Sequence, residues 1–206
     1  LPRPGSFCAQ TSQVMEELLA RYQATRDRTV ALCAPLTPED HLVQPMPDAS
    51  PAKWHLAHTT WFYEQFVLAG APYDERFAHL FNSYYEAVGP RVERARRGMV
   101  TRPGLAQVHA YRAAVDRRVR RALAEDELDA AACARLELGL HHAQPHPALL
   151  LPAAKYALGT QPLRPAYRED LPRGGACQPV PMRWRELGGG PVAIGAPDGG
   201  FAFDNE

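Results

Sequence analysis

Two histidines near the middle of the chain have the residue type and the spacing of metal ligands. His142 and His146 stand four residues apart, so on one helix both imidazoles would leave the same face, one turn apart. This spacing suits two ligands of one metal ion on a single helix. The zinc-protease motif His-Glu-x-x-His does not fit, because Ala143 follows the first histidine and supplies no carboxylate base.

A third histidine, His58, lies in the clearest helix that the sequence predicts. We expect this helix to begin with Ser50 as the N-cap and Pro51 at the first helical position. One helical face then carries four residues at i, i+4, i+7 and i+11, namely Trp54, His58, Trp61 and Gln65. A face with two tryptophans is buried, and a buried imidazole needs a polar partner. A main-chain carbonyl or a metal ion would meet that need.

Three imidazoles on two helices make a coherent candidate metal site. Nitrogen ligands alone suit Fe(II), Zn or Cu, and they leave coordination positions open for a substrate and O2. Pro145 and Pro147 flank one proposed ligand, and a proline inside a helix lacks its N–H and clashes with the carbonyl four residues back. The sequence therefore predicts a helix that is distorted at the metal, where a kink at Pro145 decides whether the ligand spacing survives.

The composition describes ordinary globular material without a strong electrostatic preference. Of 206 residues, 46% are apolar and 22% are charged, and the basic and acidic residues both number 23. No net field favours nucleic acid, and no run reaches the roughly 18 apolar residues of a membrane span. The N-terminus has no apolar signal core, so we expect a cytoplasmic protein. The scattered cysteines, which form no C-x-x-C pair, are expected to be reduced thiols: Cys8, Cys33, Cys133 and Cys177.

Apolar periodicity predicts a mainly α protein, with a four-helix bundle over residues 9–160. The expected helices cover Thr11 to about Leu32, the segment from Pro51, residues 101–123, and Leu128 to a last helix that ends near Gly159. Residues 161–180 are dense in Pro, Gly and Arg and are typical of a linker. In residues 181–206 we expect two strands, Arg183–Leu187 and Pro191–Gly195, which would begin a second, α+β domain that is incomplete in this chain.

Four motifs in order resemble the sulfoxide synthases of ergothioneine biosynthesis (EgtB-type). They are MPDASPAKWHLAHTTWF (46–62), LFNSYYEAVGPR (80–91), RGMVTRP (97–103) and GFAFDNE (200–206). The resemblance covers nearly the whole chain after about Thr11. It implies a DinB-like four-helix bundle followed by the start of a domain similar to the formylglycine-generating enzyme.

The resemblance also implies a mononuclear non-heme iron enzyme that uses O2. Such an enzyme joins sulfur from a cysteine-type thiol to the imidazole of hercynine (Nα-trimethylhistidine). The matching Fe(II) ligands are His58, His142 and His146, whereas the neighbouring His55 and His141 are left out. The partners are then small molecules, with no nucleic acid and no membrane, and the oligomeric state stays open.

Five further residues match positions that act on the substrates in the family. Tyr84 and Tyr85 correspond to a tyrosine pair near the iron, where a phenol can donate a proton. Gln144 corresponds to a position that can touch the substrate imidazole. Arg91 and Arg94 are candidate holders of a substrate carboxylate.

At the ligand helix this chain departs from the family pattern. The family usually has His-Glu-Gln-Gln-His-Gln-Glu, whereas this chain has His-Ala-Gln-Pro-His-Pro-Ala. The related selenoneine synthases join selenium from a selenosugar to hercynine, and a changed donor would motivate a re-shaped pocket. Two alternatives stay open: a metal-free DinB-like module that acts as a binding or scaffold domain, and a zinc-dependent thiol transferase that needs no O2.

Overall fold

A computed structural model describes residues 4–171, 179–196 and 201–203, with side chains from residue 13 onward except that of residue 86. Chain contacts divide the protein into two compact units, Leu1–Glu169 and Asp170–Glu206. The division falls inside the segment that the sequence predicts to be a linker. Cys177, the side chain of Cys8 and most of the 200–206 motif lie outside the described residues, and the other two cysteines, Cys33 and Cys133, are free thiols.

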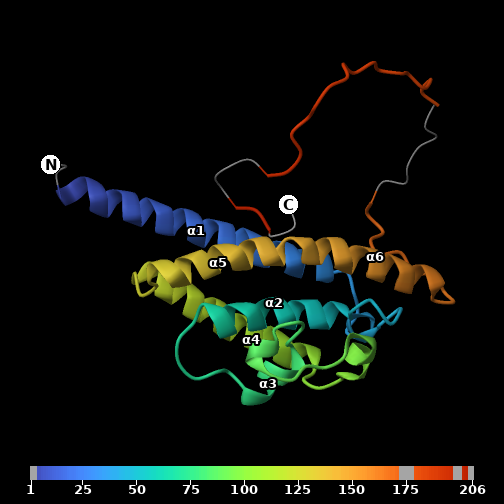
Figure 1. Cartoon of the computed structure of the whole chain (residues 1–206). Helices are drawn as coiled ribbons and strands as arrows, with labels where there is room; N and C mark the ends of the chain where they lie inside the picture. Colours follow the sequence, from blue (N-terminus) through green and yellow to red (C-terminus); the bar gives the residue numbers. More distant parts are fainter. Residues whose placement is uncertain (1–3, 172–178, 197–200, 204–206) are drawn as a thin grey trace. The chain divides into compact units, whose positions relative to one another are not determined.

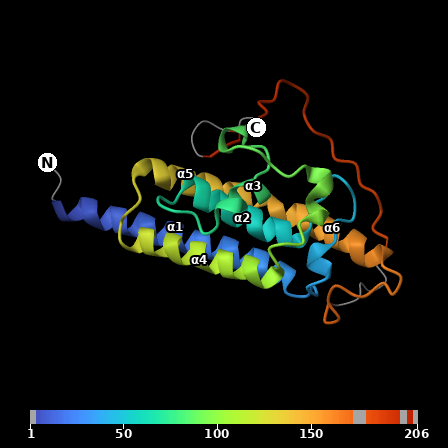
Figure 2. The same cartoon turned by 90° about the horizontal axis from the view of Figure 1, so that it is seen from below.

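The first unit is a bundle of long helices, as the periodicity predicts (Figures 1 and 2). The long helices are α1 (Pro4–Cys33), α2 (Ala52–Phe66), α4 (Leu105–Ala124), α5 (Ala130–Ala143) and α6 (Pro145–Thr160). The last two follow each other as nearly one rod and together supply the fourth side of the bundle (Figure 1). Short elements fill the connections: the helix α3 (Glu75–Leu80) and the 3-10 turns η1 (Asp40–Leu42), η2 (Glu86–Val88) and η3 (Arg94–Met99). No described helix has both the length and the apolar character that a membrane crossing requires.

Pro145 and Pro147 lie at the junction between α5 and α6. Pro145 is the first residue of α6 and Pro147 lies in its first turn, where the missing N–H groups have no helical acceptor in any case. Gln144 keeps a right-handed helical backbone (φ −65°, ψ −40°), and its N–H still bonds to the Leu140 carbonyl at 3.2 Å. The predicted distortion is confirmed as a break between two helices, and the break preserves the direction of the chain.

The beginning of α2 differs from the prediction. Pro51, not Ser50, occupies the N-cap position, and no side chain caps this end. The Ser50 hydroxyl instead accepts a hydrogen bond from Nη1 of Arg97 at 2.9 Å. The prediction was wrong because a cap preference is worth only about 1 kcal/mol, which a charge-assisted hydrogen bond from a distant residue can outweigh.

A buried polar network joins α1, α2 and α4. Arg26 donates to Asp116 at 2.8 Å and to the Thr60 hydroxyl at 2.7 Å, and the Tyr22 hydroxyl donates to Asp116 at 2.5 Å. Arg112 donates to the main-chain carbonyl of Arg26 at 2.7 Å. These charge-assisted bonds orient three helices against one another.

Gly139 sets how closely α5 approaches α2. A Cβ atom at this position would lie 2.6 Å from the Tyr63 ring and 3.1 Å from the Phe62 ring. Both rings are fully or almost fully buried, so neither can swing out into solvent. The absent side chain therefore brings His142, one turn further along α5, towards His58 on α2.

The two predicted strands are not formed. The described part of the second unit, residues 179–196 and 201–203, contains no strand, and Trp184, Val192 and Ile194 are exposed. A strand is stable only when its backbone groups pair with a neighbour, and an isolated pair of strands is marginal at best. Neither Arg183–Leu187 nor Pro191–Gly195 has such a neighbour in the described residues.

Candidate metal centre

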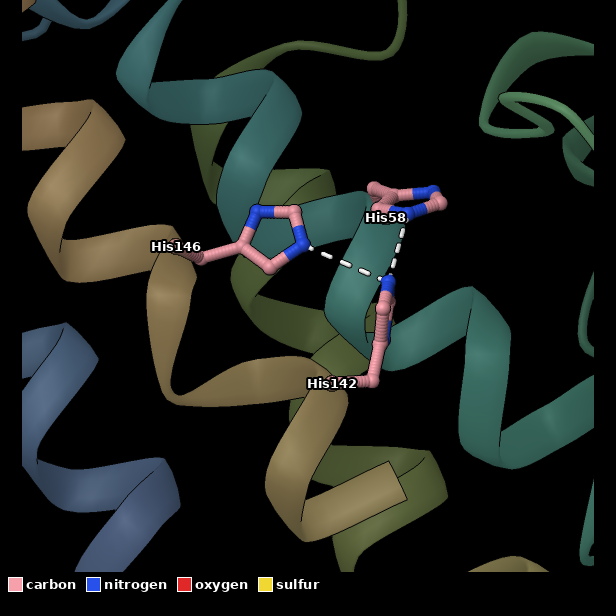
Figure 3. A group of neighbouring side chains, drawn as sticks. All are labelled: His58, His142 and His146. Atoms are coloured by element: carbon pink, nitrogen blue, oxygen red, sulfur yellow. Dashed lines mark hydrogen bonds between the residues drawn. The ribbon is translucent and has the colours of Figure 1, made fainter. Parts of the chain in front are cut away.

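Three imidazoles from two sides of the bundle point at one another (Figure 3). Nε2 of His142 lies 3.2 Å from Nε2 of His58 and 3.4 Å from Nε2 of His146. All three nitrogens lie within 4.8 Å of one another. The structure thus brings together the three histidines that the sequence singles out, although α5 ends between two of them.

Two of the three nitrogen separations match those of a metal centre. Metal–nitrogen bonds of about 2.1 Å at ligand angles of about 90–110° place neighbouring nitrogens about 3.0–3.4 Å apart. The distances around His142 fall in that range. A donor set of three neutral imidazoles fits Fe(II), Zn or Cu, and it leaves several coordination positions for small molecules.

Hydrogen bonds hold two of the three rings in the orientation that a metal ion needs. Nδ1 of His58 lies 2.7 Å from the Phe81 carbonyl, which can only accept, so the ring proton sits on Nδ1 and the lone pair on Nε2. Nδ1 of His146 lies 2.8 Å from Nδ1 of His55. If Nε2 of His146 binds a metal, its Nδ1–H must donate to His55. Partners of this kind orient metal ligands in many proteins.

Burial keeps the imidazoles of this cluster neutral. Burial lowers the pKa of His142 to about 4 and holds the pKa values of His58 and His146 well below their ordinary value. Burial, with the charge of Arg97, lowers the pKa of His55 to about 3. Metal ligation requires deprotonated imidazoles, so the site is in its binding form at neutral pH.

The histidines lie in the wall of a pocket of about 700 Å³. Beside the three histidines the wall includes Trp54, His55, Ser50, Ser83, Tyr84, Tyr85, Arg94, Arg97, Leu149 and Tyr156. This volume suits a small-molecule ligand. Of the predicted substrate residues, Tyr84, Tyr85 and Arg94 line the pocket, whereas Arg91 and Gln144 do not belong to its described wall. Gln144 is exposed at the helix junction.

The two predicted tyrosines differ in their surroundings. Tyr85 is half-buried between Trp61 and Phe66, and its ring centre lies 6.5 Å from that of His142. Burial raises the pKa of Tyr85, so its phenol keeps its proton at neutral pH. Tyr84 is 61% exposed and contacts Arg91 and Arg94, whose guanidinium carbons lie 5.1 and 5.3 Å from its ring centre. The Arg94 guanidinium also donates to the Tyr84 hydroxyl.

Sequence reasoning missed several pocket residues. The sequence places His55 only next to a candidate ligand. In the structure its Nδ1 lies 2.8 Å from Nδ1 of the candidate ligand His146. The sequence marks Arg97, which is 4% exposed, only as the first residue of the motif at 97–103, and Ser50 only as a helix cap. One signal was available for His55: it stands three residues before His58, and residues three apart share a helical face.

The fold and the donor set define a helical-bundle protein with a candidate three-histidine metal centre. The chain belongs to the DinB superfamily, whose sequence model matches residues 21–148. That match contains all three candidate ligands. A comparison with curated proteins found no matching sequence.

Proposed function

We propose that the protein is an O2-dependent non-heme iron enzyme that forms a C–S or C–Se bond at the imidazole of hercynine. The observation that supports this most is the convergence of three imidazole Nε2 atoms in the wall of a 700 Å³ pocket, with no carboxylate in the candidate ligand group. Iron held by His58, His142 and His146 would supply the redox chemistry of O2. DinB superfamily membership is compatible with the proposal and leaves the reaction open.

The residues in and next to the pocket have separable tasks in this reaction. Phe81 and His55 orient two ligand rings through their Nδ1 atoms. The Tyr85 hydroxyl holds a proton beside the three histidines, because burial raises the pKa of this phenol. Tyr84 is the less suited of the two proton donors, since it is 61% exposed and water competes for its proton.

The proposal leaves the donor as a thiol or a selenosugar. Pro145 and Pro147 replace residues that are polar in the resembling family, but neither belongs to the described pocket wall, so they do not distinguish the two donors. The sulfur of a thiol and the selenium of a selenosugar are both soft atoms, so the three-histidine ligand set does not discriminate between them. An enzymatic comparison of donors is therefore required.

Two experiments test the proposal in sequence. The purified protein, loaded anaerobically with Fe(II), is expected to retain about one equivalent of iron per chain. It is then incubated with hercynine, O2 and a panel of thiols and selenosugars, and the products are identified by mass spectrometry. Retention of zinc with thiol transfer in the absence of O2, or the retention of no metal, would reject the iron enzyme in favour of a transferase or a binding module.

A further inference from the structure

His58 is stacked between two tryptophans of its own helix. Its ring centre lies 4.4 Å from that of Trp54, at an interplanar angle of 11°, and 5.5 Å from that of Trp61, at 18°. Trp61 continues the series, since its ring centre lies 5.5 Å from that of Tyr85. Tyr85 is half-buried and lines the pocket. Aromatic rings in contact therefore lead from a candidate metal ligand to a phenol that solvent can reach.

Both rings stacked on His58 are indoles, which lose a single electron far more readily than a phenylalanine ring. When a redox-active metal ion at the three histidines reacts with O2 or peroxide in the absence of substrate, a strong oxidant forms against the His58 ring. The protein part of a redox enzyme has to control such competing reactions. An electron from one of the two tryptophans would reduce the oxidant before it damages the ligands.

The two tryptophans differ in the charge that faces them. Cζ of Arg97 lies 3.5 Å from the centre of the Trp54 ring, so a positive charge covers one face of this indole. Removal of an electron from Trp54 would create a second positive charge against the guanidinium, which Coulomb repulsion opposes. Within the described residues no cation–π contact involves Trp61. The charges therefore favour the loss of an electron from Trp61.

The indole nitrogen of Trp61 favours transfer of a radical over its storage. Trp61 is fully buried, and its Nε1 has no hydrogen-bond partner in the described part of the chain. An oxidised indole becomes a longer-lived neutral radical when Nε1–H gives up its proton, and this requires an acceptor. Without an acceptor the oxidised ring keeps its charge and draws an electron from a neighbour. The Tyr85 phenol can supply that electron, because it lines the pocket and can release its proton to water.

We propose that Trp61 and Tyr85 form an electron-transfer relay that carries oxidising equivalents away from the three histidines when the metal ion reacts without substrate. First, Trp61 gives one electron to the oxidant that peroxide forms at the metal, and Trp61 becomes a radical cation. Then Tyr85 gives one electron to Trp61 and its phenol proton to water, which leaves a neutral tyrosyl radical. A soluble thiol restores the phenol by giving up a hydrogen atom and becomes a thiyl radical. The relay rests on the redox-active metal of the proposed function and not on the hercynine reaction.

Two alternatives to the relay give a different expectation. In the first, Tyr85 is oxidised directly from His142, whose ring centre lies 6.5 Å away and meets the phenol edge to face, at 82°. This geometry gives less overlap of the ring faces than the stack of Trp61 on His58. In the second, Trp61 only packs the core. Under either alternative, replacement of Trp61 by phenylalanine leaves the yield of the tyrosyl radical unchanged.

The test uses the whole 206-residue chain, loaded anaerobically with Fe(II) and mixed with equimolar hydrogen peroxide in the absence of substrate. Samples frozen within milliseconds are measured by electron paramagnetic resonance, and protein grown with ring-deuterated tyrosine assigns the signal. We expect a tyrosyl radical that Tyr85→Phe removes and that Trp61→Phe reduces at least about tenfold per bound iron. Peptide mass spectrometry should then find that oxidation in the Trp61 variant shifts to His58 and the other candidate ligands.

Trp54→Phe is the matched control, because Trp54 stacks on the same imidazole but faces Arg97. Its tyrosyl yield per bound iron should equal that of the native chain. Trp184, 88% exposed in the second unit, reports any oxidant that escapes into solution, and it should stay unmodified in the native chain. If Trp61→Phe does not hold iron, Tyr85→Phe decides the outcome. The relay predicts that a tryptophan radical, assigned with ring-deuterated tryptophan, accumulates in this variant, and the direct route predicts none.

Three results would overturn the relay: no protein radical in the iron-loaded native chain, a tyrosyl yield that Trp61→Phe leaves unchanged, or an equal loss in the Trp54 variant. The proposed function fails separately. An iron-loaded chain that forms the Tyr85 radical through Trp61 but does not convert hercynine keeps the relay and rejects the reaction. A chain that converts hercynine but forms no radical with peroxide rejects the relay alone.

Discussion

The two sides of α2 hold two buried polar clusters that differ in how completely their members satisfy one another. The structural cluster consists of Tyr22, Arg26, Thr59, Thr60, Arg112 and Asp116. The pocket cluster consists of Trp54, His55, His58, Arg97, His142 and His146. In the structural cluster, Asp116 compensates Arg26, and the hydroxyls and carbonyls accept the remaining donors.

The pocket cluster leaves polar atoms unsatisfied. Six buried side-chain nitrogen or oxygen atoms lack a hydrogen-bond partner in the described residues, and four of them belong to this cluster: Trp54 Nε1, His55 Nε2, Arg97 Nε and His142 Nδ1. The backbone of Ser50 lies close enough to His55 to oppose the fall in its pKa, but His55 Nε2 forms no hydrogen bond of ordinary geometry with the described residues. Native interiors rarely leave such groups unpaired, so an incomplete cluster beside a pocket indicates a place for a ligand. One cluster stabilises the fold, and the other has capacity left for binding.

The largest predicted effect is the loss of iron binding when one candidate ligand of the pocket cluster is removed. His58→Ala is expected to abolish iron binding and turnover together, because two imidazoles at the α5–α6 junction cannot hold the ion alone. Metal analysis and the hercynine assay measure the two losses. His41→Ala is the control, since His41 is also buried and bonds a carbonyl through Nδ1, at 2.8 Å, outside the pocket. Retained turnover in His58→Ala would reject the ligand assignment.

A substitution in the structural cluster should lower the free energy of unfolding and leave iron binding unchanged. Arg26→Met removes the partner of Asp116, which is expected to lower the free energy of unfolding by about 3 kcal/mol. Chemical denaturation measures this loss. At temperatures where the variant is folded, its iron content should equal that of the native chain. A selective loss of iron without loss of stability would show that the two clusters are not separate in function.

The close approach of α5 to α2 affects both the stability of the bundle and the position of His142 in the pocket cluster. Gly139→Ala places a Cβ atom 2.6 Å from the Tyr63 ring, and the forced displacement of α5 should cost about 1–3 kcal/mol of stability. The same displacement should weaken iron binding through His142. Gly159→Ala, near the end of α6, meets nothing within 4 Å and should stabilise the protein by about 0.5–1 kcal/mol. Equal unfolding free energies for the two variants would contradict the packing argument.

The last prediction concerns the hydrogen bond between His55 and His146. His55→Phe keeps a ring of similar shape but cannot accept from Nδ1 of His146, so iron affinity should fall about tenfold or more. His55→Gln, whose amide oxygen can accept, should recover part of that loss. Competition with a chromophoric chelator measures both affinities. A simple packing role would give the opposite order, with the phenylalanine variant closer to the native protein.

The amount that could be predicted differs between the helices and the residues between them. The stripe through Trp54, His58 and Trp61 predicts that this side of α2 is buried, because helical periodicity is local. The structure buries all sides of α2 over residues 52–64, which only the surrounding helices decide. The strands at Arg183–Leu187 and Pro191–Gly195 were predicted from β-propensity alone, which does not supply the pairing partner that a strand requires. The pocket roles of Ser50 and Arg97 depend on contacts across 47 residues of chain, which no local pattern encodes.

The sequence alone determined the helices, the three candidate ligands and the conflict that the prolines introduce, since each of these depends on residue types a few positions apart. Only the tertiary structure decided that Pro145 starts a helix instead of spoiling one, because the cost of a proline depends on which N–H groups already lack an acceptor. It also decided that His55 and Arg97 face the pocket. Burial and hydrogen bonding between distant segments set the charge, orientation and tautomer of these groups, and those properties arise only when the helices pack.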